Sequence, residues 1–372
     1  MKVAYFILNP FDFDSRARLE VETIKSMGHR VEVVATTGGE LNNYLGCPIH
    51  RVSQSAWPSR KIRFIQYNLK ASSIGIGLKA DVYHAVDLDV LFAANRGAGK
   101  NGGKLVYESR ELYTELQALE GRRTVKALWR GLERRLIGKA DKIITINNSI
   151  AVELMKRYAV RRPAIIRNVA PSAKRIQPVD LRLKLKIPEN HRIIIYQGVL
   201  RDGQGLAYLL GLMPMLNDVT LVILGDGPSG SPLRALSFRL GIGDRVRFMG
   251  KVSPDALLNH TVSADVGALL MEDVALNNRL ALPQKLFQYL SAGVPQIVSS
   301  MPEIAGFVQK EKTGVVVSLG DPEKDAAIIS EFLADKARYG DARNNCVRAA
   351  RENNWEIESL VLTRIYRELE EN

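Results

Sequence analysis

Short apolar runs alternate with stretches of helical periodicity along most of the chain. In the first half, six apolar runs predict buried strands, at residues 2–8, 30–35, 81–86, 104–108, 142–147 and 163–167. The stretches between them that have the period of a helix are 15–28, 60–79, 111–139 and 148–158. This alternation predicts an α/β domain built on a doubly wound parallel sheet.

The same alternation starts again after a polar, proline-bearing stretch between Pro171 and Pro188, which predicts a linker. The strands expected in the second half are 192–198, 219–224, 245–249, 265–270, 295–299 and 314–318. The helices expected there are 204–215, 230–240, 254–262, 283–292 and 302–308, and the last fifty residues look helical. The sequence therefore predicts two Rossmann-like domains, residues 1–172 and 173–354, and a closing helix at 355–372 that packs back on the first domain. Ligands are expected at the carboxyl ends of the strands.

Composition narrows the class of protein. A chain of 372 residues with 46% hydrophobic and 25% charged positions suits two globular domains, and it excludes collagen, coiled coil and disorder. Cys47 and Cys346 lie in opposite halves with no Cys-x-x-Cys, so a disulfide framework and a thiolate zinc site are not expected. The first apolar run is too short for a signal peptide core or a membrane span. The expected location is the cytoplasm.

Charge is distributed unevenly. Residues 1–175 carry a net charge of +14, whereas the rest of the chain carries −2. Such asymmetry indicates an anionic partner for the first half. Because no RNA-recognition or zinc-finger signature accompanies it, we expect an anionic membrane surface at the inner face of the cell membrane rather than nucleic acid.

Residues 122–139 combine seven basic residues with an apolar stripe at helical spacing, formed by Val125, Leu128, Trp129, Leu132 and Leu136. This composition suits an interfacial helix on an anionic membrane, and it equally suits a helix whose stripe packs on its own domain. We favour packing for the apolar stripe, and a membrane or an anionic acceptor for the basic face.

Two segments of the second half are candidates for ligand binding. Gly225-Asp-Gly-Pro228 follows a predicted strand and precedes a helix, where glycine allows close approach of the backbone to a phosphate, although such turns are often purely structural. In the segment 282–295, Pro283 suits the first position of a helix, and Lys285 lies in the first turn. A cation there opposes the helix dipole unless an anion lies close by.

Together these residues resemble glycosyltransferase family 4, with the GT-B fold. The likeness rests on Pro283-x-Lys-x-Phe-x-Tyr289, the Gly225 turn and the two tandem units, and it extends over nearly the whole chain. In the first half it continues in Asp14-Ser-Arg16, Asp81-Val-Tyr-His-Ala-Val-Asp87 and Val106-Tyr-Glu-Ser-Arg-Glu-Leu112.

The resemblance implies two Rossmann-like domains that face an interdomain cleft, and transfer of a sugar from a nucleotide diphosphate sugar with retention of configuration. It implies no cofactor and no bound metal, so Asp12-Phe-Asp14 and Asp87-Leu-Asp89 are read as coincidental matches to a metal-binding motif. The expected acceptor is a lipid-linked saccharide or a precursor of a surface polysaccharide. The residues implied for the donor are Gly198, Arg201, Gly225, Lys251, Leu282, Lys285 and Gln288. Those implied for catalysis are His84, Asp87 and Arg110, with Arg16 and Glu111 on the acceptor side.

Several positions depart from the family pattern. Gln288 and Leu280 stand where the family usually has glutamates, and Val199 and Gln204 stand where it usually has an arginine and a lysine. Val86 and Arg110 replace two frequent histidines. These departures leave a second hypothesis open, in which the protein is a catalytically silent scaffold that binds a partner or a nucleotide sugar. A nucleotide-sugar epimerase, which can share the fold, is disfavoured by the acceptor-type motifs. For His84 a buried structural histidine and a ligand role remain equal alternatives.

Overall fold

The computed structural model describes residues 1–53, 60–172 and 176–371. Its contacts divide the chain into two compact units, each built on one sheet. The first unit comprises Met1–Arg167 together with Glu356–Asn372, and the second comprises Asn168–Trp355. The predicted domain boundary at 172 and 173 adjoins residues 173–175, which lie outside the described residues.

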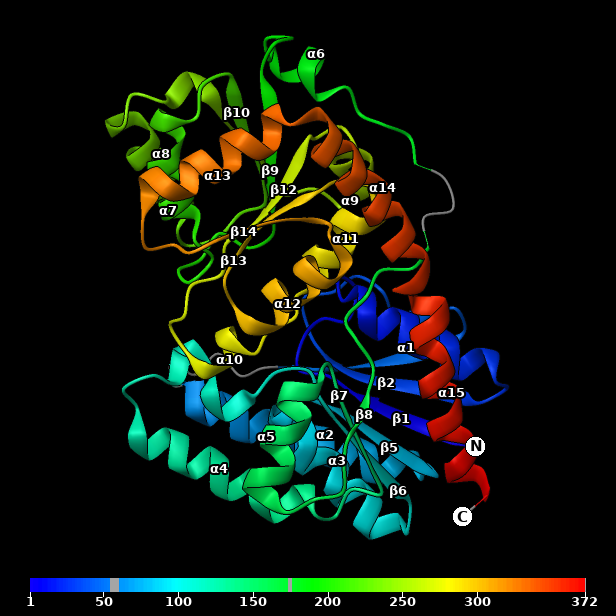
Figure 1. Ribbon diagram of the computed structural model, residues 1–372. Helices are drawn as coiled ribbons and strands as arrows, with labels where there is room; N and C mark the ends of the chain where they lie inside the picture. Colours follow the sequence, from blue (N-terminus) through cyan, green and yellow to red (C-terminus); the bar gives the residue numbers. More distant parts are fainter. Residues whose placement is uncertain (54–59, 173–175, 372) are drawn as a thin grey trace. The chain divides into compact units, whose positions relative to one another are not determined.

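The first unit has an eight-stranded sheet with the order β3-β4-β2-β1-β5-β6-β7-β8, parallel except for the β3–β4 pair. Its strands are β1 (Lys2–Phe6), β2 (Arg30–Thr36), β3 (Asn43–Tyr44), β4 (Cys47–Val52), β5 (Val82–Val86), β6 (Lys104–Ser109), β7 (Lys142–Thr145) and β8 (Ala164–Ile165). Its helices are α1 (Ser15–Ser26), α2 (Arg60–Leu78), α3 (Leu88–Asn101), α4 (Arg123–Ile137), α5 (Asn148–Tyr158) and α15 (Trp355–Glu371). The chain returns to this unit at its end, where α15 lies beside β1 and β2 (Figure 1).

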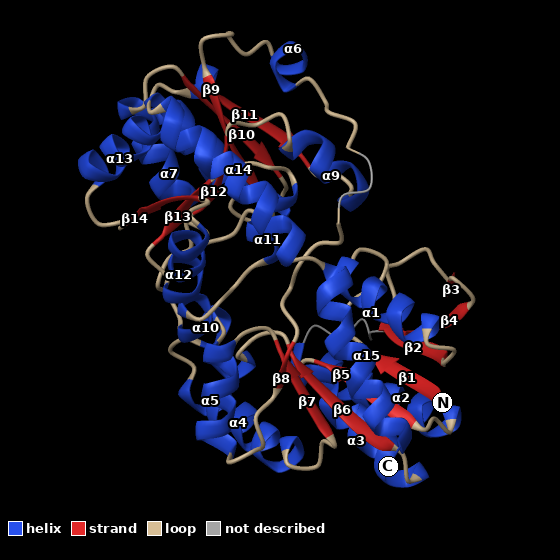
Figure 2. Cartoon of the chain, turned by 45° about the vertical axis from the view of Figure 1, so that its right-hand side comes forward, coloured by secondary structure: helices blue, strands red, loops and turns tan. Residues whose placement is uncertain are grey.

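The second unit has a six-stranded parallel sheet with the order β11-β10-β9-β12-β13-β14. Its strands are β9 (Arg192–Gln197), β10 (Val219–Leu224), β11 (Val246–Gly250), β12 (Val266–Leu269), β13 (Gln296–Ser299) and β14 (Gly314–Val317). Its helices are α6 (Leu181–Leu185), α7 (Leu206–Leu212), α8 (Gly230–Arg239), α9 (Pro254–Thr261), α10 (Leu276–Arg279), α11 (Gln284–Ser291), α12 (Pro302–Glu311), α13 (Pro322–Ala334) and α14 (Lys336–Glu352). Figure 2 shows helices surrounding each sheet. The doubly wound α/β class predicted from the sequence is confirmed.

The predicted single helix over 111–139 is wrong. The segment begins with two short 3₁₀ turns, Tyr113–Glu115 and Gln117–Leu119, and only then forms α4. Gly121, at φ +73°, separates the turns from the helix, because glycine adopts this left-handed conformation without steric cost. The Glu115 carboxylate then holds the turn in place through ion pairs with Lys126 and Arg157.

The apolar stripe predicted on α4 packs only in part. Leu136 is 4% exposed, as expected for a packed position, but Leu128 is 75% exposed. The packing predicted for Leu128 is therefore wrong, and α4 presents an apolar side chain to solvent between its basic residues. Among the described residues, no helix is both long enough and apolar enough to cross a membrane.

The pattern of apolar residues did not predict helix α3 or strand β4. Helix α3 follows β5 after a single residue, so the apolar run of the strand merges with that of the helix. Its glycine-rich sequence also weakens a helical prediction, although Gly97 has a packing reason: a Cβ there would lie 2.4 Å from the Tyr83 ring. In β4, Pro48 and His50 interrupt the apolar alternation.

Candidate functional site

Arg110 follows β6 directly and lies at the centre of a buried charge network in the first unit. Its Nε donates to Glu108 at 3.1 Å, and its Nη1 donates to both oxygens of Asp14 at 3.1 Å. Its Nη2 donates to the Tyr5 hydroxyl at 2.9 Å and to Glu20 at 3.1 Å. All five guanidinium N–H groups are thus matched by an acceptor, so Arg110 holds neighbouring side chains of its own unit in place.

Arg16, on the first turn of α1, is the second cation of this network and is 3% exposed. Its Nε donates to Glu20 at 2.8 Å and to Glu108 at 2.9 Å, and its Nη1 donates to the carbonyl of Ile166 at 3.0 Å. Burial alone would raise the pKa of Glu108, but Arg110 and Arg16 hold it well below its usual range.

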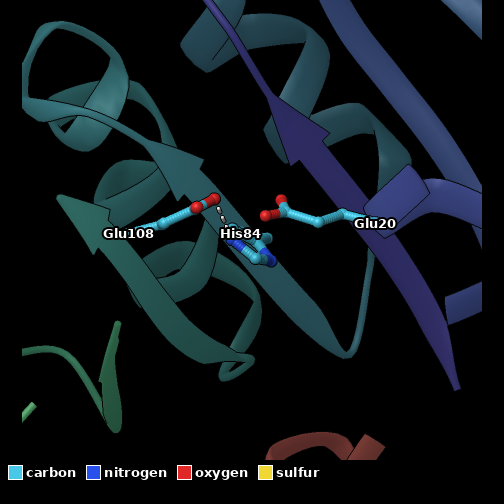
Figure 3. Close-up of side chains that lie close together, drawn as sticks. All are labelled: Glu20, His84 and Glu108. Atoms are coloured by element: carbon cyan, nitrogen blue, oxygen red, sulfur yellow. Dashed lines mark ion pairs between the residues drawn. The ribbon is translucent and has the colours of Figure 1, made fainter. Parts of the chain in front are cut away.

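His84, on β5, is completely buried and lies between the carboxylates of Glu20 and Glu108 (Figure 3). Its Nδ1 lies 2.9 Å from the hydroxyl of Tyr366 on α15, and its Nε2 lies 3.4 Å from Glu108. Glu20, His84 and Glu108 offer three ligand atoms within 4.8 Å of one another, the spacing of a possible metal site. The Arg16 and Arg110 guanidiniums already balance the carboxylate charge there, so the donor set does not favour a cation. The catalytic role assigned to His84 stays a prediction.

Asp87 lies between β5 and α3 in a conformation that is rare for a residue with a side chain, φ 64° and ψ 169°. Its Oδ1 accepts the backbone N–H of Arg110 at 2.8 Å. Burial and the nearby carboxylates of Asp89 and Glu111 raise the pKa of Asp87 well above its ordinary value. Burial likewise raises the pKa of Asp89 to about 7, and Glu111 adds to the effect. This end of the sheet therefore brings three acidic side chains together.

In the second unit, the two glycine loops predicted to bind the donor lie against each other. The Gly198 N–H donates to the Leu224 carbonyl at 2.9 Å, and the Leu200 N–H donates to the Asp226 carbonyl at 3.1 Å. A Cβ on Gly225, which has φ +139°, would lie 1.9 Å from the Gly198 carbonyl oxygen. Glycine is therefore required here for the close approach of two loops, and its contact with a ligand stays a prediction.

Lys285, on the first turn of α11, lies beside these loops. Its Nζ donates to Oε1 of Gln204 at 2.9 Å and lies 4.4 Å from the centre of the Tyr196 ring. It is also near Gly198, where a Cβ would lie 3.4 Å from the ammonium. Burial and the charge of Arg201 lower the pKa of Lys285 to about 7. The structure thus brings Gly198, Arg201 and Lys285 together at the carboxyl end of β9.

Gln288, one turn further along α11, is joined to β9 by a hydrogen bond. The Gln197 Nε2 donates to its Oε1 at 2.6 Å, and Gln197 in turn accepts from the Thr261 hydroxyl at 2.7 Å. This assignment leaves the Nε2 of Gln288 as a donor directed to other groups. Leu282 is buried before α11, and Lys251 is exposed after β11.

Some residues of these clusters were not predicted. Glu20, Glu108 and Tyr366 complete the charge network, and Tyr196 and Gln197 support Lys285 and Gln288. Glu108 stands within a run expected to be a buried strand, which signals a paired charge, because a buried carboxylate needs a partner. Tyr366 has no comparable signal, since an apolar stripe on a helix does not tell which strand it covers.

Two protein-family models match the chain. The model described as "Glycosyltransferase Family 4" matches residues 18–170, and "Glycosyl transferases group 1" matches residues 180–353. The chain belongs to the family 4 glycosyltransferases. The predicted family is confirmed. The GT-B fold class is confirmed as well, because solved GT-B structures match 99% of the chain.

Curated relatives of this family 4 glycosyltransferase include a D-inositol 3-phosphate glycosyltransferase of Streptomyces avermitilis, 25% identical over 63% of this chain and 53% of the relative. A GDP-mannose-dependent alpha-(1-6)-phosphatidylinositol monomannoside mannosyltransferase of Mycobacterium tuberculosis is 29% identical over 43% of this chain and 42% of the relative. The chain therefore spans about half the length of the curated relatives that it matches.

Solved structures share the fold over the full chain. Sucrose-phosphate synthase of Thermosynechococcus elongatus has a TM-score of 0.84 at 17% identity and covers 99% of both chains. Anabaena HepE in complex with UDP-glucose has a TM-score of 0.78 at 14% identity and covers 99% of this chain and 100% of its own. At such identities the likeness establishes the fold of this glycosyltransferase and leaves its substrates to other arguments.

The charge network leads to a stability prediction. Replacing Arg110→Met keeps most of the volume but leaves Asp14, Glu20 and Glu108 with only Arg16 as a cation. We expect the free energy of unfolding to fall by about 3–5 kcal/mol, as when one partner of a buried ion pair is removed. Denaturant unfolding at pH 7 measures this. The matched control is Arg135→Met at an exposed position of α4, and equal stability of the two variants would contradict the structural role of Arg110.

Proposed function

We propose that the protein is a retaining glycosyltransferase that moves a sugar from a nucleotide diphosphate sugar to a saccharide acceptor. The observation that carries the proposal is the cluster of Lys285, Arg201 and the paired glycine loops at the carboxyl end of the second sheet. Ligands of open α/β sheets bind at this edge. The similar structure of Anabaena HepE, which is in complex with UDP-glucose, supports the choice of donor class.

In this proposal the leaving diphosphate is stabilised without a metal. Lys285 supplies charge from the first turn of α11, and the exposed Arg201 supplies more from the adjoining loop. The helix N-terminus adds a positive dipole end, which favours an anion. A partly neutral lysine regains its full charge when a diphosphate arrives, so Lys285 is suited to bind the charge that develops on the leaving group.

Gln288 is the proposed contact to the ribose of the donor. Because its Oε1 already accepts from Gln197, the amide reaches a hydroxyl oxygen only as a donor. A glutamate at this position would still accept from Gln197 through one oxygen and would offer the other to two ribose hydroxyls. Ribose binding through Gln288 is therefore expected to be weak but present.

The acceptor is proposed to bind to the first unit, with Asp87 as the acidic group at the edge of the sheet. Arg16, His84 and Arg110 act there through the groups that they hold, because Arg16 and His84 are buried and the guanidinium of Arg110 is fully engaged. Glu111 completes this edge. A lipid-linked saccharide or a precursor of a surface polysaccharide is the acceptor class that we propose.

The first test is a thermal-shift screen with UDP-, GDP- and ADP-sugars, followed by transfer and hydrolysis assays with the nucleotide that binds. We expect Gln288→Glu to tighten donor binding about tenfold, since a charge-assisted hydrogen bond is worth about 1.5 kcal/mol more than none. Leu280→Glu, at the other position where the family has glutamate, serves as the comparison. Binding without hydrolysis or transfer would favour the catalytically silent alternative, and absence of binding, hydrolysis and transfer across the panel would refute the proposal.

The pKa of Lys285 predicts how donor binding depends on pH. Since a diphosphate binds the ammonium form, binding takes up a proton once the free lysine is neutral. Affinity should therefore be full below pH 7 and fall as the pH rises from 7 to 8.5, by up to about tenfold per unit. Isothermal titration calorimetry measures the slope. Lys285→Met should bind weakly with no slope, whereas Lys336→Met, exposed on α14, should behave as the unmodified protein. A slope that persists in Lys285→Met would assign the titration to another group.

We also propose that the first unit docks on an anionic membrane through α2 and α4. The rings of Phe64 on α2 and Trp129 on α4 lie 4.9 Å apart, so the two helices are neighbours. Their exposed apolar side chains are Ile62, Ile65, Leu69 and Leu128. The exposed basic residues on α4 or directly beside its ends include Arg122, Arg123, Arg134, Arg135 and Lys139. Exposed apolar side chains together with basic residues are typical of a protein surface that binds an anionic membrane.

Vesicle sedimentation tests this surface. The protein should bind vesicles in which about 30 mol% of the lipid is phosphatidylglycerol, and should not bind vesicles of pure phosphatidylcholine. The double variant Arg134→Gln, Arg135→Gln should weaken binding about 30-fold, because each basic residue near the surface contributes about 1 kcal/mol. Phe238→Ser, at an 84% exposed position of the second unit, is the control. Equal binding to both kinds of vesicle would contradict an electrostatic surface.

A further inference from the structure

Beside the strained Asp87, the first unit has a group of aromatic rings. Tyr113 lies 5.0 Å from Trp129, ring centre to ring centre, and Trp129 lies 4.9 Å from Phe64, both in edge-to-face arrangements. All three rings are only partly buried. The carboxylates of Asp89 and Asp87 lie close enough to Tyr113 to raise the pKa of its hydroxyl, in addition to the effect of burial.

Two oxygens next to these rings have no hydrogen-bond partner. Asn68, one turn after Phe64 on α2, is 2% exposed, and its Nδ2 donates to the Asp89 carbonyl at 2.9 Å and to the Phe64 carbonyl at 3.2 Å. Its Oδ1 and the Oδ1 of Asp89 are both without a partner. Buried acceptors without a donor are rare in proteins, and a ligand rich in hydroxyl groups supplies donors.

The charge at this edge is opposite to that of the unit as a whole. Besides burial, Asp89 and Glu111 raise the pKa of Asp87, and Glu111 raises that of Asp89, so the three acidic side chains lie close together. Arg110 reaches Asp87 through its backbone N–H, while its guanidinium is directed to Asp14, Glu20, Glu108 and Tyr5. At pH 8, above the pKa of about 7 of Asp89, this edge carries negative charge. A phosphate or carboxylate placed there would be repelled, although residues 1–175 carry +14.

We propose that Asp87, Asp89, Glu111 and the partly exposed rings of Tyr113 and Trp129 form a subsite for an uncharged sugar ring that carries no phosphate. The apolar face of a pyranose packs on aromatic rings, and its hydroxyl groups donate to carboxylates and to the amide of Asn68. Naming this ring the acceptor rests on the transferase function proposed above, whereas its binding does not. An acceptor linked to a lipid through phosphate thus places its sugar at this edge, with the phosphate elsewhere.

The test is saturation-transfer difference NMR on the full chain at pH 8, with methyl α-glucoside, methyl α-galactoside and methyl α-mannoside as neutral probes. Glucose 6-phosphate and glucuronate are the anionic probes. We expect at least one neutral glycoside to bind, with saturation of its ring protons, and the two anions to bind at least tenfold more weakly. Asp89→Asn should lower the affinity for the neutral glycoside about tenfold.

Controls separate this subsite from a loss of folding and from the transferase function. Asp89→Asn removes a buried charge of raised pKa, so its thermal stability at pH 8 should equal or exceed that of the unmodified protein. Asp244→Asn, exposed in the second unit, should leave glycoside binding unchanged. If no neutral glycoside binds, or if an anion binds as well as the neutral probes, the proposal is wrong. Nucleotide binding and transfer are measured separately, so they can succeed while this proposal fails, and the reverse.

Discussion

The first unit depends on the hydrogen bonds and ion pairs that the guanidinium of Arg110 makes with buried carboxylates. Three carboxylates converge on this guanidinium: Asp14 at the N-cap of α1, Glu20 on α1 and Glu108 on β6. A buried carboxylate without a partner costs several kcal/mol, so these groups can share one interior only if cations lie between them. The same residue holds Asp87 through its backbone N–H. The residue that neutralises the buried carboxylates therefore also positions Asp87, at the edge of the sheet where we propose that the sugar binds.

In the second unit, the buried cation is Lys285. Gln204 stands where the family usually has a lysine. Lys285 places a cation beside this position, because its ammonium donates a hydrogen bond to the Gln204 side chain. Neutral partners, the Gln204 amide and the Tyr196 ring, hold the ammonium without a carboxylate. An unpaired cation in a low-dielectric setting is poorly stabilised, which is why its pKa falls to about 7. The absence of a counter-ion in this contact leaves the charge for a ligand.

The sheets could be predicted from the sequence because their strands are continuous apolar runs, as in β9 and β10, whose residues are almost wholly buried. Strand β4 could not, because Pro48 and His50 break the pattern. Of the candidate site, the positions of Lys285 and Gly198 followed from the motif and the order of strands. The engagement of Arg110 and the burial of His84 did not, because both depend on long-range partners: Tyr366 is 282 residues away from His84. The expected contact of either side chain with a ligand remains a prediction.

The return of α15 to the first unit has a consequence for the order of folding. The second unit is one continuous stretch of chain, Asn168–Trp355, whereas the first unit is completed only by Glu356–Asn372. On the ribosome the second unit therefore emerges whole before Tyr366, the partner of His84, is made. Until then His84 lacks its cover, and the Glu358 carboxylate that holds Arg167 is also missing. The buried charge network is thus completed only after the whole second unit has been made, by the helix that follows that unit in the sequence.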